Sequence, residues 1–171
     1  MSAITVWEGR FIAVKVDGRW EYATRARGIG AAVILAIDDG AVLLVEQYRV
    51  PLGCRCLELP AGLVGDETAG EAVEQAAARE LEEETGYRAG RVESLGLFHA
   101  SPGMTSEAFT LVRATDLTRV GAGGGVAEEA ISVHRVPIAD INAFVAARRA
   151  AGVAIDAKLL MLLGVTVISP F

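Results

Sequence analysis

The sequence predicts an α/β fold in which helices cover the faces of a mixed sheet. Short apolar segments around Asp-Gly turns predict β-hairpins, and an alanine- and glutamate-rich stretch near the middle predicts a helix. The chain has 171 residues, of which 52% are hydrophobic, so it can bury one substantial core.

Two hairpins are expected in the first third of the chain. The turn sequences Asp17-Gly18 and Asp38-Asp39-Gly40 each stand between two apolar runs. A further short strand leads into Pro60. The strands expected in this part of the chain are residues 11–16, 19–24, 31–37, 41–48 and 57–59.

The second half of the chain alternates strands, a glycine-rich loop and helices. Two strands flank the turn Ser101-Pro102-Gly103. Residues 120–126 include Gly-Ala-Gly-Gly-Gly, and we expect a flexible loop there, because such a sequence gives little reason for order by itself. The other expected elements are strands at residues 91–99, 108–115 and 131–136 and helices at residues 138–151 and 156–163.

The central helix is expected between residues 68 and 86. Thr68 and Glu71 have the spacing of a capping box, and Gly86 suits the left-handed residue that ends a helix. Apolar side chains at helical spacing would face the core. They are Ala72, Val73, Ala76, Ala77 and Leu81.

The last turn of this helix carries Glu80, Glu83 and Glu84, an arrangement that is unfavourable in an inert helix. Carboxylates three or four positions apart share a face and repel by about 0.2–0.5 kcal/mol per pair. The C-terminal end of a helix also favours cations. Arg79 supplies one positive charge. The cluster is therefore either a solvated acidic helix end or the site of a divalent cation.

The spacing of these residues resembles the signature of the Nudix hydrolases. A glycine, five residues, a glutamate, seven residues and then Arg-Glu-apolar-any-Glu-Glu-any-Gly-apolar are matched by Gly65, Glu71, Arg79, Glu80, Leu81, Glu83, Glu84, Gly86 and Tyr87. The resemblance covers nearly the whole chain from about Trp7. It implies a Nudix-type α/β/α sandwich with a mixed curved sheet at residues 29–171, preceded by an N-terminal antiparallel hairpin segment at residues 1–28.

The resemblance also implies a metal site. In that family the glutamates of the last helical turn bind Mg²⁺ or Mn²⁺, and the metals hold a diphosphate. Glu80, Glu84 and the carbonyl of Ala61 would coordinate Mg²⁺, or Mn²⁺, with Glu83 beside them. Mg²⁺ favours such carboxylate oxygens together with substrate phosphates.

The loop before the helix departs from the family pattern. In the ADP-ribose branch the signature glycine follows a Pro-Ala pair, whereas here Pro60-Ala61 precedes Gly62, three residues ahead of Gly65. The loop therefore resembles the family's with about three residues inserted, and either glycine could hold the structural role. The other residues with implied structural roles are Glu71, Arg79 and Gly86.

Three further segments resemble the ADP-ribose pyrophosphatase branch: residues 46–49 with 57–62, residues 101–103 and residues 128–133. The implied reaction is hydrolysis of ADP-ribose to AMP and ribose 5-phosphate. Glu129 or its neighbour Glu128 would be the general base, with Glu83 as the rival candidate. The alternatives are the same chemistry on GDP-mannose or a UDP-sugar, and a non-catalytic sensor of ADP-ribose or NAD-type ligands.

The same resemblance implies substrate-binding residues. Arg49 ends an apolar strand and would bind a phosphate, unless it is an ordinary surface charge. In relatives the N-terminal segment crosses to the second subunit of a homodimer, where an aromatic ring stacks on adenine. Trp20 or Trp7 could do this here, unless these rings only cover the hairpin. The other implied substrate-binding residues are Glu21, Arg25, Glu58 and Met104.

Composition argues against other classes of partner. The net charge of −6 disfavours nucleic acid, and neither a leader nor a membrane-spanning apolar run is expected. Cys54 and Cys56 are expected to be reduced and structural, as in a cytoplasmic protein, with a shared metal as the alternative. His99 and His134 are expected to be ordinary strand residues.

Overall fold

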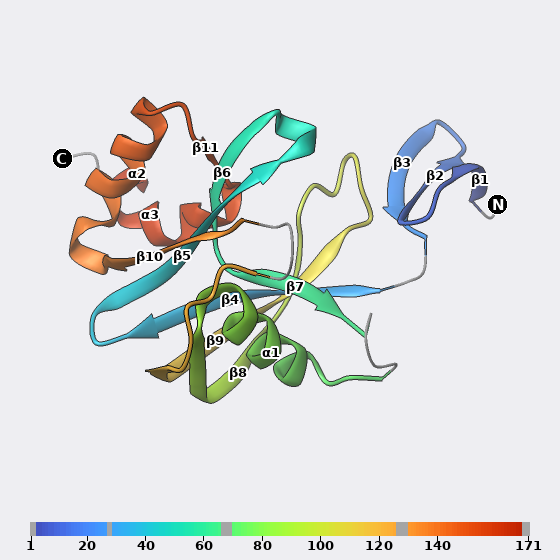
Figure 1. The fold of residues 1–171 in the computed structure, drawn as a ribbon. Coiled ribbons are helices and arrows are strands. Elements are labelled where there is room, and N and C mark those ends of the chain that lie inside the picture. The colour runs from blue at the N-terminus through green and yellow to red at the C-terminus, as the bar shows by residue number, and fades with distance from the viewer. Residues whose placement is uncertain (1–2, 27–28, 66–69, 126–129, 169–171) are drawn as a thin grey trace.

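The computed structural model of the chain describes residues 3–26, 29–65, 70–125 and 130–168 (Figure 1). These residues form a three-stranded antiparallel sheet near the N-terminus and an eight-stranded mixed sheet with helices on both faces. The α/β fold with a mixed sheet and an N-terminal hairpin region is confirmed. Within the described residues, no helix has the length and apolar character needed to cross a membrane.

The small sheet contains β1 (Ile4–Glu8), β2 (Ile12–Asp17) and β3 (Trp20–Arg25). β2 and β3 form the expected hairpin, each shifted by one residue from its predicted range. β1 was not predicted, and all five of its side chains are exposed. A strand without a buried face lacks the alternation of apolar and polar residues by which a strand is recognised.

The large sheet has the strand order β11-β6-β5-β4-β9-β8, and in addition β10 pairs with β5 and β7 with β4. The β4–β9 and β6–β11 pairs are parallel and the others are antiparallel. The strands are β4 (Gly30–Asp38), β5 (Ala41–Arg49), β6 (Cys54–Glu58), β7 (Ala61–Val64), β8 (Tyr87–His99), β9 (Ala108–Arg119), β10 (Ser132–Pro137) and β11 (Ala154–Ile155).

The hairpin of β4 and β5 divides this sheet into two halves. The two strands pair only beside their turn, at Ile37–Val42 and Asp38–Ala41. Beyond these pairs β4 bonds to β7 and β9, whereas β5 bonds to β6 and β10. The end of β5 and the start of β4 therefore diverge, and they leave room for a ligand between the two halves.

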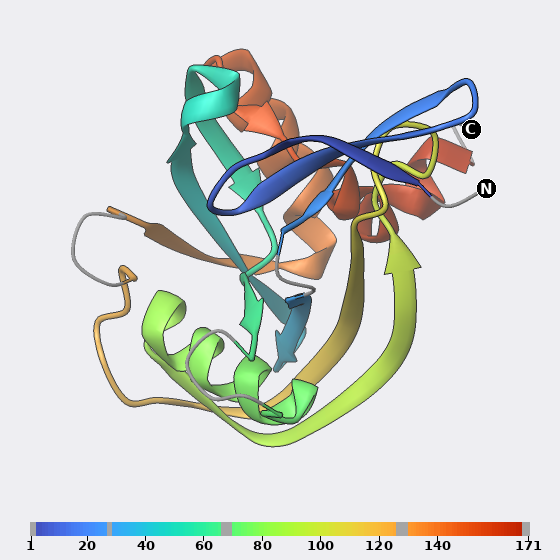
Figure 2. The ribbon, with the colours of Figure 1, turned by 90° about the vertical axis from the view of Figure 1, so that its right-hand side faces the viewer.

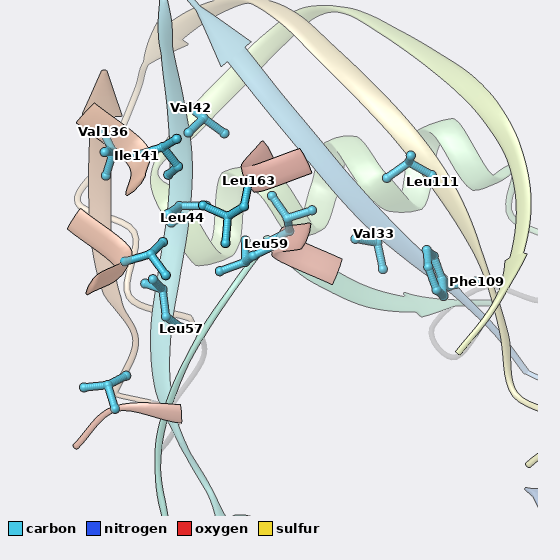
Figure 3. Close-up of a cluster of buried hydrophobic side chains, with 13 residues drawn as sticks. Val33, Val42, Leu44, Leu57, Leu59, Phe109, Leu111, Val136, Ile141 and Leu163 are labelled. Carbon is cyan, nitrogen blue, oxygen red and sulfur yellow. The ribbon is translucent and has the colours of Figure 1, made fainter. Parts of the chain in front are cut away.

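Helices cover opposite faces of the sheet. Ala32 and Ile34 of β4 pack in a cluster with Leu81 of α1 (Val73–Thr85). Val33, which points the other way, belongs to the cluster that includes α2 (Ile141–Ala150) and α3 (Leu160–Ile168), part of which is drawn in Figure 3. Strands β8 and β9 curve around α1 (Figure 2). The short 3-10 turns are η1 (Val50–Leu52), η2 (Ile138–Asp140) and η3 (Ala157–Leu159).

The start of α1 was predicted wrongly. The helix begins at Val73, its N-cap is Ala72, and no side chain caps it. Glu71 pairs with Arg79, and Thr68, the other member of the expected capping box, lies outside the described residues. The predicted end is correct, since Gly86 has φ of +74° and donates its N–H to the Glu82 carbonyl. Ala76, Ala77 and Leu81 are buried, as the apolar stripe predicts.

Hydrogen bonds between β3 and residues 104–106 of the same chain hold the small sheet against the large one. The amide of Ala23 in β3 donates to the Met104 carbonyl, and the amide of Ser106 donates to the Ala23 carbonyl, each over 3.0 Å. The Ser106 hydroxyl also lies 2.8 Å from that of Thr24. These contacts place β3 beside the turn that joins β8 and β9.

Candidate functional site

The last turn of α1 gathers carboxylates around one guanidinium. Arg79 Nη1 lies 2.9 Å from Glu80 Oε1 and 3.5 Å from Glu83 Oε2. Arg79 Nε lies 3.5 Å from Glu71 Oε1. The arginine side chain is only 21% exposed, so solvent screens these attractions less than at an open surface. Arg79 thus offsets part of the repulsion among the glutamates and fixes the orientation of Glu80.

Glu80 and Glu84 reach from α1 to the start of β7. The amide of Ala61 donates a hydrogen bond to Glu84 Oε2 over 3.1 Å. Glu80 lies directly over Gly62, since a Cβ on Gly62 would be 1.9 Å from Glu80 Cδ. Gly62 therefore leaves the space that the Glu80 carboxylate fills. Gly65 ends β7 with φ of +84° and serves the turn instead.

The donors here fit the predicted hard cation. Glu80 and Glu84 face the Ala61-Gly62 backbone, and all of these groups offer oxygen. Among the described residues, no three acidic, histidine or cysteine side chains converge on one point. Mg²⁺ suits such a site, because it is usually bound by one or two carboxylates and completes its shell with water and substrate phosphates.

The helix end is closed by residues 121–125, which we call the glycine clasp. Gly124 N–H donates to the Glu84 carbonyl over 2.8 Å, and Gly125 N–H donates to the Glu83 carbonyl over 3.1 Å. Gly121 N–H donates to the Gly86 carbonyl over 3.0 Å. The last carbonyls of a helix lack partners inside it, and these amides supply them. Residues 121–125 form a loop, as predicted, and the order that this loop lacks by itself is supplied by its hydrogen bonds to the end of α1.

Close packing and positive φ explain why glycines recur in and beside the clasp. A Cβ on Gly123 would lie 2.4 Å from the Thr85 carbonyl carbon, and a Cβ on Gly86 would lie 2.5 Å from the Gly121 carbonyl oxygen. Gly123, Gly124 and Gly125 also have positive φ, which other residues adopt only with strain. The absence of side chains at these glycines thus allows the backbone of the clasp to lie close to the backbone at the end of α1.

A cavity of about 490 Å³ opens beside the carboxylates, where β4 and β5 diverge. Its size is typical of a small-molecule site. Four basic and five acidic side chains line it, so its charge is nearly balanced before any ligand binds. They are Arg25, Arg49, Arg79 and Lys158, and Glu58, Glu80, Glu83, Glu84 and Glu107.

Arg49 enters this cavity as half of a bidentate ion pair. Its Nε and Nη2 donate to the two oxygens of Glu58 over 2.6 and 2.7 Å. These hydrogen bonds raise the pKa of Arg49 above its ordinary value, so the guanidinium stays charged. Glu58 is 5% exposed and would be costly to bury without this partner. The predicted substrate residues Arg49 and Glu58 therefore lie together at the wall of the cavity.

Arg25 brings the small sheet into the same cavity. Its Nη2 lies 2.6 Å from Glu107 Oε1, and both residues line the cavity wall. Glu107 immediately precedes β9, so this ion pair joins β3 to the large sheet. Arg25, predicted to bind substrate from the N-terminal hairpin, thus lies at the cavity of its own chain, and contribution of the hairpin to a second subunit stays a prediction.

The other predicted substrate residues lie elsewhere. Trp20 is 57% exposed and lines a separate open hollow with His99 and Pro102. Glu21 is exposed on β3, and Met104 is 67% exposed. Trp7 folds over Gly9, where an added Cβ would lie 2.5 Å from its ring. The predicted bases Glu128 and Glu129 lie outside the described residues.

The sequence did not single out Gln47, Glu107, Phe109 and Lys158, which also line the cavity. Phe109 and Lys158 are associated, because the ammonium lies 5.8 Å from the ring centroid. Gln47 lies within the motif at residues 46–49 without a role of its own there, whereas Glu107, Phe109 and Lys158 belong to no local motif. Only Gln47 carried a usable signal, since it alternates with Glu46 on β5 and so faces the same side as Arg49.

Glu46, in the predicted motif at residues 46–49, points away from the cavity. It is 3% exposed and accepts hydrogen bonds from Arg55 and Arg148 Nε over 2.7 and 2.8 Å. Burial raises the pKa of Glu46, but these hydrogen bonds outweigh it and leave the pKa lowered. Burial also lowers the pKa of His134, which lies 3.5 Å from Glu46. Glu46 thus ties α2 to the sheet.

The two cysteines are free thiols, as predicted. Burial, with Glu58 and Asp156 nearby, raises the pKa of Cys56 to about 12. A thiol must lose its proton to bind a metal. Without a metal, Cys56 is therefore protonated at neutral pH.

Comparisons with known proteins agree with this geometry. The model of the NUDIX domain matches residues 26–158. The chain is 40% identical over 90 residues to the ADP-ribose pyrophosphatase of Bacillus subtilis, covering 52% of this chain and 47% of that protein. It is 41% identical over 113 residues to the ADP-ribose pyrophosphatase of Mycobacterium tuberculosis, covering 65% and 54%. The chain thus spans about half the length of these curated relatives.

A solved structure is also similar. The crystal structure of an ADP compounds hydrolase superposes with a TM-score of 0.66 at 25% identity, covering 84% of this chain and 81% of that one.

Gly62→Ala should weaken divalent-cation binding without unfolding the protein. The three atoms nearest to the new Cβ all belong to the flexible Glu80 side chain, so we expect the carboxylate to move and the backbone to stay in place. We expect Mn²⁺ affinity, measured by calorimetry, to fall by about 10–100-fold. Gly30→Ala, on the neighbouring strand, is the control, because its Cβ makes an ordinary 3.6 Å contact. Equal Mn²⁺ affinity in both variants would contradict the role of Gly62.

Gly123→Ala should destabilise the fold. Gly40→Ala is the control, because its φ of +67° matches the +68° of Gly123 and no atom lies within 4 Å of its new Cβ. The control should cost only left-handed strain, about 1–2 kcal/mol. Overlap with Thr85 should add about 1–3 kcal/mol for Gly123→Ala, measured by denaturant unfolding. Equal losses of stability would mean that the clasp is not closely packed.

Proposed function

The chain belongs to the NUDIX family, and we propose that it is a hydrolase that cleaves ADP-ribose to AMP and ribose 5-phosphate with Mg²⁺, or alternatively Mn²⁺. The observation that carries the proposal is the convergence of Glu80, Glu84 and the Arg49–Glu58 pair on one cavity. The names of the two ADP-ribose pyrophosphatases and of the ADP compounds hydrolase support this substrate class.

We assign the cation to the helix end and the start of β7. Glu80, Glu84 and the Ala61 carbonyl would hold it, supported by the Gly62 cradle and the Ala61–Glu84 hydrogen bond. When bound, a divalent cation polarises a diphosphate and lowers the pKa of a water molecule. Arg79 keeps Glu80 oriented, and the glycine clasp keeps the turn that carries Glu84 in place.

The substrate would lie across the cavity with its diphosphate between α1 and Arg49. The Arg49 guanidinium is planar and already aligned by Glu58. Its remaining N–H groups can therefore donate hydrogen bonds to a phosphate. Trp20 offers an exposed ring for the adenine in the hollow that it lines with Pro102. Glu21 and Met104 are sequence neighbours of residues that line this hollow. Arg25, on the same strand β3 as Trp20, lines the cavity that would hold the diphosphate.

Glu129 is the proposed general base, with Glu128 and Glu83 as its rivals. Gly125 is bonded to the Glu83 carbonyl, and Ile131 N–H donates to the Gly124 carbonyl over 3.1 Å. Both ends of the segment that contains Glu128 and Glu129 are therefore anchored beside the metal-binding turn. A carboxylate supplied from such a segment could take a proton from the attacking water.

We also propose a homodimer in the cytoplasm. The small sheet exposes large apolar side chains that a second copy of the chain would cover, including Ile4, Trp7 and Phe11 at 68, 54 and 66% exposure. Exchange of the N-terminal segments, residues 1–28, would bring a partner's hairpin to residues 29–171. The free thiols agree with a reducing compartment.

A substrate panel tests this function. The purified protein is given ADP-ribose, GDP-mannose, UDP-glucose and NADH with Mg²⁺ or Mn²⁺, and products are separated by chromatography. We expect AMP from ADP-ribose as the fastest reaction. Faster cleavage of another nucleotide sugar would move the assignment to that substrate, and binding of ADP-ribose without AMP release would identify a sensor. Size-exclusion chromatography of the same protein tests the dimer, and elution at the mass of a single chain would contradict it.

Glu83→Gln should reduce turnover of ADP-ribose by about two orders of magnitude or more while the unfolding midpoint changes little. Glu83 lines the cavity and its side chain is 35% exposed, so its loss removes a charge from the site and little packing. Glu82→Gln is the control, because Glu82 lies on the same turn and pairs with Arg88 outside the cavity. Near-normal turnover in Glu83→Gln would contradict the assignment of the metal site to this helix turn, which places Glu83 beside the cation.

Glu129→Gln should lower kcat by about 10²–10⁴-fold and change KM much less, because a base acts in the transition state. Glu128→Gln is the matched comparison on the adjacent residue. If only Glu128→Gln has this effect, the base is Glu128. If neither variant loses turnover, the base is not on this segment and Glu83 takes the role. Steady-state kinetics with ADP-ribose measure all three outcomes.

A further inference from the structure

Gln47 is a cavity residue to which the proposed reaction gives no role so far. It lies in β5, is 8% exposed and lines the same cavity as Arg49 and Glu58. Its side-chain amide has an NH₂ group with two donors and an oxygen that accepts. Within the described residues, no side chain or backbone group forms a hydrogen bond with this amide. Gln47 is therefore a buried polar side chain without a protein partner.

Such an amide is unfavourable in the protein without a ligand. Burial removes water from the donors and the acceptor, and this loss is recovered only when another group forms a hydrogen bond with them. The partnerless side-chain atoms that are fully enclosed in the described residues are Arg25 Nε and His134 Nε2, and the Gln47 amide is not among them. The amide thus keeps contact with the cavity space, and a ligand in the cavity can supply the missing partner.

The sheet places Gln47 beside the Arg49–Glu58 ion pair. Gln47 pairs with Cys56 of β6, Arg49 lies two residues after Gln47, and Glu58 lies two residues after Cys56. Because β5 and β6 are antiparallel, Arg49 and Glu58 lie on opposite sides of the Gln47–Cys56 pair and on the same face of the sheet. Their hydrogen bonds of 2.6 and 2.7 Å therefore span this pair. A ligand oxygen bound by the remaining N–H groups of Arg49 is within reach of the Gln47 amide.

We propose that Gln47 is a substrate-binding residue whose amide donates a hydrogen bond to the phosphate that Arg49 binds. This inference rests on the proposed function, in which the diphosphate lies between α1 and Arg49. Phosphate oxygens accept hydrogen bonds, and the NH₂ group of the amide supplies donors without adding a charge to the wall. Because both side chains come from one strand, the sheet fixes the spacing between them.

Calorimetric binding of α,β-methylene ADP with Mg²⁺ tests this role, because the analogue carries the diphosphate and cannot be cleaved within it. Gln47→Met removes the donors and keeps the length of the side chain. The dissociation constant should rise by about 10–100-fold, the loss expected for a hydrogen bond to a charged group. Gln75→Met is the control, because Gln75 is the only other glutamine of the chain and is exposed on α1. It should bind the analogue as the unaltered protein does.

A second substitution and a second ligand test which group the amide contacts. Gln47→Glu keeps the shape and an acceptor but removes the donors, so it should bind α,β-methylene ADP no better than Gln47→Met does. Binding near that of the unaltered protein would mean that the amide accepts a hydrogen bond, and would overturn the proposal. α,β-Methylene ADP-ribose should lose the same factor in Gln47→Met. A loss confined to this analogue would place Gln47 at the distal ribose and would also overturn the proposal.

Thermal unfolding of the protein without ligand separates binding from folding. Methionine fills a similar volume and buries no unsatisfied donor, so Gln47→Met should keep or raise the unfolding midpoint. A midpoint that falls by several degrees would mean that the amide has a partner inside the folded chain, and the proposal would then be wrong.

The outcomes distinguish this inference from the proposed function. If the unaltered protein binds neither analogue, the proposed function is wrong and the role of Gln47 is lost with it. If the unaltered protein binds both analogues and Gln47→Met binds them equally well, only the role of Gln47 is wrong.

Discussion

The structure depends on the way in which the C-terminal end of α1 is closed. This end carries Glu83 and Glu84 where the helix already presents negative carbonyls, so the charge of the side chains and the dipole of the backbone add. The amides of Gly124 and Gly125 bind these carbonyls directly. Because each amide places a positive partial charge at the helix end, the clasp relieves the backbone part of the conflict and leaves the carboxylates to a cation.

The side-chain part of the conflict is met by Arg79, which contacts Glu71, Glu80 and Glu83. Exposed ion pairs contribute little to stability, but these groups are partly desolvated and share one guanidinium. Breaking such a cluster costs more than forming it gains, because the remaining carboxylates would keep their burial and lose their partner. The arrangement therefore fixes the orientation of the glutamates and adds little to the free energy of unfolding. Both devices, the clasp and the arginine, serve the placement of carboxylates.

The sequence predicted what is local and missed what is brought together from a distance. The spacing from Arg79 to Gly86 is set by the period of one helix, so the cluster and its end could be read directly. The clasp could not, because a glycine run has no preferred conformation until Thr85 and Gly86 come close to it. Lys158 was missed because a lysine in an apolar segment carries no signal until β9 places Phe109 beside it.

The loop before α1 shows how contacts can replace spacing. About three extra residues separate Ala61-Gly62 from the helix relative to the family pattern, yet Gly62 still lies under Glu80 and Ala61 still bonds to Glu84. β7 is held in register by its pairing with β4, and α1 is held by its packing on the same strands. With both ends fixed, the connection between them can change length at small entropic cost. The site is therefore defined by two surfaces that meet, and the path of the chain between them is secondary.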